Sequence, residues 1–146
     1  MTLKDWEDHR WLRPHQASQS EIATLRQAVA DDLEDAATKG LSPSWRFNIA
    51  YNAALRLCTI VLAAEGYRPE RDSKHYRTIG ALKEVFGERA AALADYLDHC
   101  RGRRHDVTYE GVRNVSVAEA EELITAVHDL RKLVAGWISK VHPDLA

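Results

Sequence analysis

Apolar residues recur every three or four positions along most of this chain, which is the spacing of one buried face of an α-helix. The first such run consists of Ile22, Leu25, Val29, Leu33 and Ala36. Ser18 precedes it with Glu21 three residues later, which is a capping-box pattern, and Gly40 follows it as a stop signal. The sequence therefore predicts a helix over about residues 19–39.

A second run is apolar on nearly every side. It begins at Ser42 and Pro43, a helix-capping residue followed by a first-turn proline, and it ends before Gly66. Because such a helix has no broad polar face to turn toward water, residues 43–65 are predicted to form the central, buried helix.

Three further helices are predicted from the same spacing, at about residues 75–86, 88–102 and 116–142. In the first of them, either His75 or Tyr76 takes the first inward position. Strand patterns are nearly absent, and the one short β-like stretch is residues 107–109. Five helices with short connections predict an all-α fold, an antiparallel up-and-down helical bundle. The longest connection, residues 103–115, has a length that is more often functional than idle.

Length and composition fit one such domain. The chain has 146 residues, of which 45% are hydrophobic and 29% are charged. This supplies enough apolar surface for one core and too little chain for two. We expect a single domain over residues 18–146, preceded by an N-terminal extension of residues 1–17.

The cysteines and the N-terminus argue against a disulfide-rich, zinc-binding or secreted protein. Cys58 and Cys100 are too few for a disulfide scaffold or a cysteine-based zinc site, and the histidines show no metal-ligand spacing. No cofactor or metal is therefore predicted. The first residues contain no apolar leader, and the most apolar run, residues 53–64, is shorter than the ~20 residues of a membrane span. We expect a cytoplasmic protein without a membrane segment.

Charge is distributed unevenly, although the net charge is only −2. Residues 66–104 carry nine basic and six acidic residues, and Arg77 in this region is one candidate for binding an anion. The other candidates stand close together in sequence: Arg101, Arg103, Arg104, His105 and Tyr109. Because guanidinium groups suit phosphate oxygens, this cluster predicts a contact with RNA or a nucleotide. The alternative is a solvated helix end, where arginines favour the negative pole of the helix dipole.

Gly102 leaves two geometries open for this cluster. In a continuous helix, Arg101, His105 and Tyr109 lie four residues apart on one face, whereas in a helix that ends at the glycine only Arg101 stays helical. In phosphodiester chemistry, an arginine stabilises charge on the phosphorus oxygens and a histidine moves the proton of a 2′-hydroxyl or of the leaving oxygen. The alternative is a surface or capping histidine, with Asp106 paired to a nearby arginine.

The predicted central helix also carries a line of polar residues: Asn48, Asn52, Arg56 and Thr59. Each costs roughly 1–3 kcal/mol if it is buried without a partner. One interpretation is an internal hydrogen-bond network. The functional interpretation places Asn52 and Arg56 opposite the segment from Arg101 to His105, where they line one groove.

Two stretches of the chain resemble the HEPN domain family. They are LSPSWRFNIAYNAALRLCTIVLAAEGYRPERDSKHYRTIGAL, residues 41–82, and CRGRRHDVTYEG, residues 100–111. The resemblance extends over residues 18–145 and is strongest to a small prokaryotic subgroup of stand-alone HEPN proteins. HEPN domains are small α-helical bundles, often paired with nucleotidyltransferases. Active members are metal-independent endoribonucleases that act as dimers, and others bind RNA, nucleotides or a partner protein.

The family motif, an arginine followed after four to six residues by a histidine, corresponds by position to Arg101 and His105. Only three residues separate the two here, and Gly102 stands where family members have a polar residue. The resemblance therefore implies an RNA- or nucleotide-binding homodimer in a toxin–antitoxin, defence or nucleotidyltransferase-associated system. The alternative it implies is an endoribonuclease that uses Arg101 and His105 to form a 2′,3′-cyclic phosphate.

Overall fold

The computed structural model describes residues 1–71, 74–109 and 115–146, and for Lys74 and residues 105–109 it describes the backbone alone. The elements in chain order are α1 (Leu3–Asp8), β1 (Leu12–Pro14), α2 (Gln19–Ala36), α3 (Pro43–Ala64), β2 (Tyr67–Pro69), α4 (Lys74–Phe86), α5 (Glu88–Tyr109), α6 (Val117–Val141) and the short 3₁₀ helix η2 (Pro143–Leu145). The prediction of an all-α fold is confirmed.

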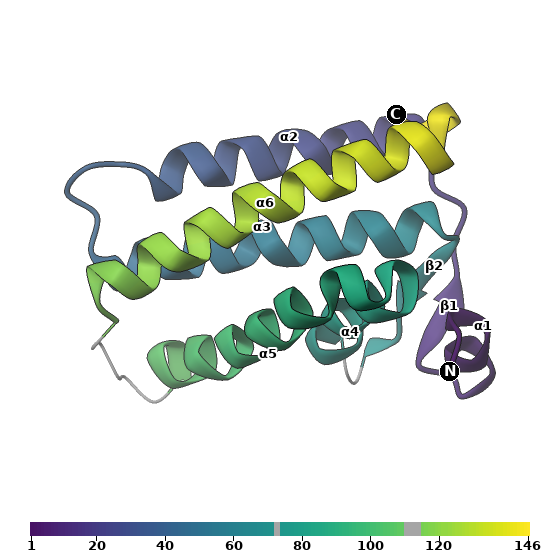
Figure 1. Ribbon diagram of the computed structural model, residues 1–146, viewed down its shortest axis with the longest axis horizontal. Helices are drawn as coiled ribbons and strands as arrows, with labels where there is room; N and C mark the ends of the chain where they lie inside the picture. Colours follow the sequence, from purple (N-terminus) through teal and green to yellow (C-terminus); the bar gives the residue numbers. More distant parts are fainter. Residues whose placement is uncertain (72–73, 110–114) are drawn as a thin grey trace.

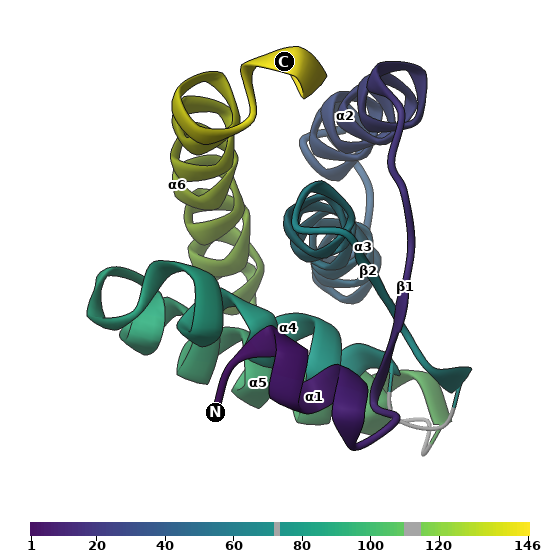
Figure 2. The same cartoon turned by 90° about the vertical axis from the view of Figure 1, so that its right-hand side faces the viewer.

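Helix α3 lies at the centre of the bundle (Figures 1 and 2). It contacts α2, α6, α4 and α5, while α4 and α5 form an antiparallel pair along one side of the molecule. The fully buried side chains of α3 include Tyr51, Cys58 and Ile60. This burial on several sides is the reason that the helix shows no broad polar face in the sequence, only a narrow line of polar residues.

The predicted helix starts are confirmed by capping hydrogen bonds. The side chains of Ser18, Ser42 and Ser116 accept hydrogen bonds from the backbone N–H groups of Glu21, Trp45 and Glu119, respectively. These bonds satisfy N–H groups that have no partner within the first helical turn. Local sequence therefore determines where α2, α3 and α6 begin.

The N-terminal segment is more structured than the sequence indicates. Strand β1 pairs antiparallel with β2, with Leu12 opposite Pro69 and Pro14 opposite Tyr67. Trp6 and Leu12 of this segment form a second small core with Leu62 of α3 and Ala81 of α4. The expectation that residues 107–109 are the one β-like stretch is wrong, because these residues are helical and the two strands lie elsewhere.

Helix α5 continues through Gly102 as far as Tyr109. The predicted connection over residues 103–115 is therefore wrong for residues 103–109, and of the two geometries the continuous helix is the one observed. Glycine destabilises a helix interior by roughly 0.5–1 kcal/mol relative to alanine, an amount that tertiary contacts readily offset.

We expect Gly102→Ala to raise the free energy of unfolding by about 0.5–1 kcal/mol. A Cβ at this position would meet no atom within 4 Å, so the substitution removes backbone freedom without a clash. Gly87→Ala is the matched control. It also has open space, but its φ is +62°, so it is expected to destabilise by about 1 kcal/mol. Urea denaturation of both variants measures the difference, and a destabilised Gly102→Ala protein would contradict a helical Gly102.

Helix α3 is long and apolar enough to cross a membrane by length and composition alone. However, 61% of its most apolar window is buried inside the bundle. Its hydrophobicity is accounted for by its position as the core helix of this fold.

Candidate nucleic-acid interface

Arg101 lies on α5 with its side chain partly exposed to solvent. Its Nε donates a hydrogen bond to Asp98 Oδ1 at 2.9 Å, and its side chain is 40% exposed. Its guanidinium carbon lies 5.6 Å from the centroid of the Tyr76 ring on α4. Among the described residues, no hydrogen bond from its two terminal nitrogens is found.

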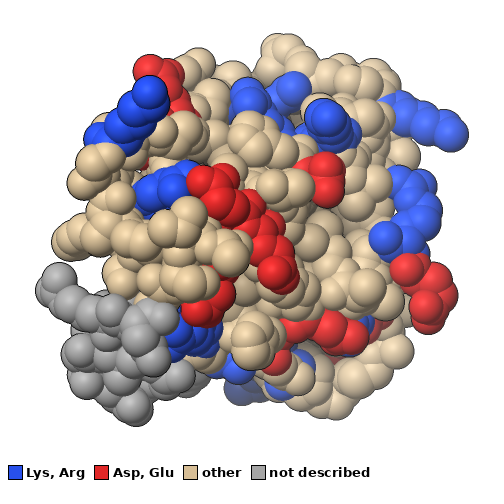
Figure 3. All heavy atoms as spheres, turned by 60° about the vertical axis from the view of Figure 1, so that its left-hand side comes forward, with Lys and Arg blue, Asp and Glu red and all other residues tan. Residues whose placement is uncertain are grey.

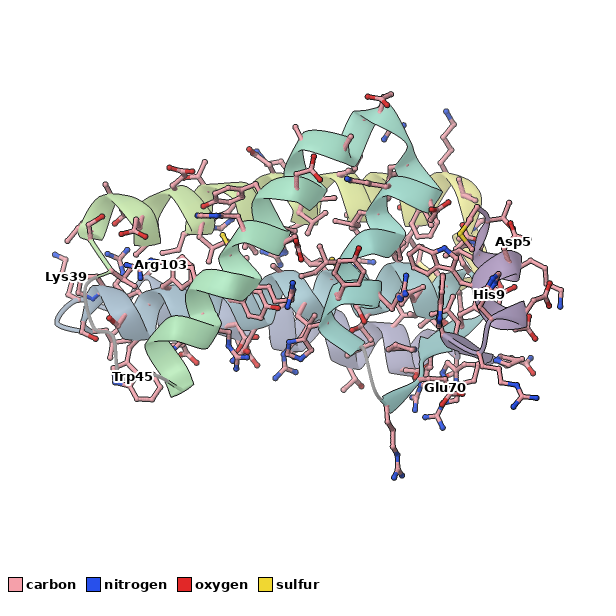
Figure 4. The ribbon with its side chains drawn as sticks, turned by 90° about the horizontal axis from the view of Figure 1, so that it is seen from below. Asp5, His9, Lys39, Trp45, Glu70 and Arg103 are labelled. Carbon is pink, nitrogen blue, oxygen red and sulfur yellow. The ribbon has the colours of Figure 1, made fainter. Side chains whose placement is uncertain are left out.

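Arg103 joins α5 to the start of α6. Its Nε donates to Glu119 Oε2 at 3.0 Å, and an Nη2 lies 3.5 Å from Oε1 of the same carboxylate. Glu119 also accepts a bond from the backbone N–H of Ser116, so one side chain caps α6 and holds α5. Figure 4 shows Arg103 at the same end of the bundle as Lys39 and Trp45. Arg103 thus has a role in positioning α5.

The hydrogen bond from Arg103, together with the backbone bond from Ser116, lowers the pKa of Glu119. When folding lowers the pKa of a carboxyl group, the ionised group stabilises the folded state. For Glu119 this stabilisation is fully present above the pKa of the unfolded chain, near 4.5. It is lost as the pH falls through the lower pKa of the folded state. We therefore expect Glu119→Gln to lower the free energy of unfolding at pH 7 by up to about 1 kcal/mol, because the side chain is 39% exposed and screened.

The measurement is denaturant unfolding of both proteins at pH 7 and at pH 3. Glutamine retains an oxygen for the Ser116 cap, so the substitution tests the charge. The difference in free energy of unfolding between wild type and variant is expected to disappear at pH 3. An equal difference at both pH values would contradict the role of the Arg103 ion pair.

Arg104 points toward the bundle and lies over a buried tyrosine. Its guanidinium carbon is 5.1 Å from the centroid of the Tyr51 ring. Burial raises the pKa of Tyr51 to about 12, and its hydroxyl lies 3.3 Å from Nδ1 of His75 on α4. The Nε of Arg104 is buried and has no hydrogen-bond partner among the described residues. Tyr51 therefore links α3 to both α4 and α5 directly beneath the arginine cluster.

The side chains of His105, Asp106 and Tyr109 lie outside the described residues. Their backbone belongs to α5, so helical register puts positions 101, 105 and 109 on one side of a continuous helix. Arg101 is the member of this row whose side chain the structure describes.

Of the polar residues along α3, Arg56 contacts α2, and Thr59 bonds the backbone of its own helix. Arg56 Nε lies 3.1 Å from Asp32 Oδ2 on α2, and Thr59 bonds the backbone oxygen of Leu55. Asn52 is half-buried. Among the described side chains, no hydrogen bond or ion pair joins Asn52 or Arg56 to α5. The groove shared by α3 and α5 therefore stays a prediction.

Arg77 is held by aromatic side chains of the N-terminal segment. Its guanidinium carbon lies 3.5 Å from the centroid of a Trp11 ring and 5.7 Å from Trp6. It lines a groove of about 260 Å³ together with Trp6, Tyr76, Lys83, Asp95 and Asp98. Tyr76 is not among the site residues that the sequence predicts. The sequence offers it only as an alternative to His75 for an inward position, whereas the structure exposes 53% of Tyr76 and turns His75 toward Tyr51.

Basic and acidic side chains lie next to one another over the face drawn in Figure 3. In the described part of the chain, no group of three or more His, Cys, Asp or Glu side chains is placed to hold a metal ion.

A family model described as SAV_6107-like HEPN matches residues 36–135, which is more than half of the chain. The chain belongs to the HEPN family. The matched region extends from the end of α2 into α6 and so contains the whole of α3, α4 and α5. Membership supports a nucleotide- or RNA-related function at the level of the HEPN family. No match is found among curated protein sequences, and none among solved structures.

Proposed function

We propose that this HEPN protein binds RNA or nucleotides through the face of α5 that carries Arg101. The supporting observation is the continuity of α5 through Gly102, which puts positions 101, 105 and 109 in one row on the helix. The Nε bond to Asp98 orients the Arg101 guanidinium, and the proposal assigns its terminal nitrogens to phosphate oxygens.

The other predicted binding residues take supporting roles in this proposal. Arg103 and Arg104 add positive potential near the row and fix α5 against Glu119 and Tyr51. Arg77, Asn52 and Arg56 lie on neighbouring helices, and Arg77 and Arg56 are already engaged by Trp11 and Asp32, respectively. The proposal therefore assigns the first phosphate contact to Arg101, with Tyr109 extending the same row.

We further propose that the protein acts as a homodimer in the cytoplasm, without a cofactor. HEPN domains generally dimerise and bind RNA. A nucleotidyltransferase is the proposed protein partner, in a toxin–antitoxin or defence setting, as the family resemblance implies. In a dimer, two copies of the α5 row would double the number of phosphate contacts on one RNA strand.

The second candidate function is metal-independent RNA cleavage, which the one-turn separation of positions 101 and 105 favours. In this reaction His105 takes the proton of a 2′-hydroxyl, and the 2′-oxygen forms a bond to phosphorus as the bond to the 5′-oxygen breaks. A protonated histidine returns a proton to the leaving 5′-oxygen, and the other product is a 2′,3′-cyclic phosphate. Arg101 stabilises the negative charge on the phosphorus oxygens.

Incubation of an end-labelled single-stranded RNA with the protein and excess chelator distinguishes the two functions. Binding without cleavage, weakening steeply as salt is raised, is the expected result. Cleavage by the wild type that disappears in His105→Ala supports the second function. Absence of both binding and cleavage would contradict the proposal.

A further inference from the structure

Tyr76, in the first turn of α4, has an unusually open aromatic ring. Of the aromatic side chains that the structure describes, only Tyr76 and Trp45 are exposed, at 53% and 55%. Aromatic rings contribute large apolar surfaces, and Tyr and Trp are enriched at binding interfaces. Tyr76 differs from Trp45 in its surroundings.

The guanidinium groups of two arginines lie over the Tyr76 ring at cation–π distance. The guanidinium carbon of Arg101 is 5.6 Å from the ring centroid and that of Arg77 is 5.3 Å from it. Both arginines are themselves held, Arg77 by Trp11 and Arg101 by Asp98. The ring is therefore part of a preorganised surface in which a half-exposed aromatic side chain adjoins positive charge. Within the described residues, no arginine is stacked on Trp45.

We infer that Tyr76 is a stacking platform for an unpaired base of single-stranded RNA, and that the phosphate of the bound strand is contacted by Arg101. This inference rests on the proposed function and adds a base-contacting residue to it. Sites for single-stranded nucleic acid combine aromatic rings, on which bases stack, with a positive groove for the backbone. Because base and phosphate are joined through one sugar, a base on Tyr76 brings a phosphate toward Arg101.

The same geometry selects the form of the RNA. Bases in a duplex are already stacked on their neighbours and offer no open face to the ring, so a single strand is the expected ligand. Every base has a π-face, so affinity is expected to depend little on base identity. The groove beside Tyr76, with Asp95 and Asp98 in its wall, gives the edge of the base room to enter.

The test uses a single-stranded RNA with one 5-iodouridine, which cross-links to a stacked aromatic ring under ultraviolet light. The cross-link is expected to map to Tyr76 by mass spectrometry. Tyr76→Leu is expected to bind about 5- to 100-fold more weakly, the range of aromatic stacking, whereas Tyr76→Phe keeps the wild-type affinity. Tyr76 is exposed, so circular dichroism is expected to show the same folded state in all three proteins.

Two controls make the outcome specific. Trp45→Ala removes a similarly exposed ring on which no arginine is stacked among the described residues, and it is expected to keep wild-type affinity. Uridine monophosphate tests whether a lone nucleotide is enough, and it is expected to compete far less well than the oligonucleotide. Equal losses in Tyr76→Leu and Trp45→Ala, or equal competition by the mononucleotide, would overturn the inference.

Failure of the inference is distinguishable from failure of the proposed function. A wild-type protein that binds no RNA overturns both. Wild-type binding that weakens in Arg101→Ala but not in Tyr76→Leu, or a cross-link that maps to another residue, overturns the role of Tyr76 and leaves the role of Arg101 intact.

Discussion

Replacing Tyr51 by Ala is expected to lower the free energy of unfolding by about 3–5 kcal/mol, the range for removing a large buried aromatic side chain. The Tyr51 side chain is fully buried in α3, and it lies between His75 on α4 and Arg104 on α5. Its removal leaves a cavity where three helices meet. Because domains of this size are stable by about 5–15 kcal/mol, the loss is a large fraction of the total. Urea denaturation followed by circular dichroism measures it.

Tyr51→Phe is the matched control, since it keeps the ring and removes only the hydroxyl near His75. This substitution is expected to lower the free energy of unfolding by about 1 kcal/mol at pH 7. Burial raises the pKa of Tyr51 to about 12, so the folded state keeps the phenol neutral while the unfolded chain ionises above pH 10. The wild type is therefore expected to lose stability between about pH 10 and 12, and Tyr51→Phe to lose less. An Ala variant as stable as the Phe variant would contradict the placement of Tyr51.

The parts of the fold that depend on local chemistry could be predicted from the sequence. Helix starts follow from serine caps, whose bonds span three residues, and the central position of α3 follows from its all-round apolarity. In both cases the information lies within a few turns of chain.

Features that depend on distant residues could not be predicted. Strand β1 has no strand pattern of its own and forms only because Leu12 meets Pro69 across a long stretch of sequence. Gly102 indicates a helix end locally, but Arg103 and Arg104 bond or stack on residues of α6 and α3 and keep the helix continuous. Tertiary contacts of this kind override a local preference of about 1 kcal/mol.

In the candidate site, too, local features could be predicted from the sequence and contacts between distant residues could not. The sequence identifies a cluster of arginines, but it does not show which guanidinium groups are engaged within the fold. The structure engages Arg103 with Glu119 and Arg104 with Tyr51, and it leaves Arg101 partly open. Tyr76 has no signal in periodicity, because its neighbour His75 fits the inward position equally well.

Arg101→Ala is expected to weaken binding of single-stranded RNA by about 10- to 100-fold, because a hydrogen bond to a charged group contributes about 1.5–3 kcal/mol. The plot of log affinity against log salt is expected to become shallower by about 0.7 for each RNA phosphate that the variant no longer neutralises. Fluorescence anisotropy at several salt concentrations measures both quantities. The salt slope reports ionic interactions with the strand, so a change in slope separates weaker phosphate binding from a general change in fold.

Two variants establish whether the effect belongs to this arginine. Arg101→Lys keeps the charge and removes the planar two-pronged geometry, so its affinity is expected to lie between those of wild type and Arg101→Ala. Arg89→Ala removes an exposed arginine at the opposite end of the same helix and is expected to change neither affinity nor slope by a comparable amount. If Arg89→Ala and Arg101→Ala weaken binding equally, the RNA responds to overall positive charge and α5 has no dedicated phosphate contact. A decrease in affinity confined to the Arg101 variants assigns that contact to the exposed row of α5.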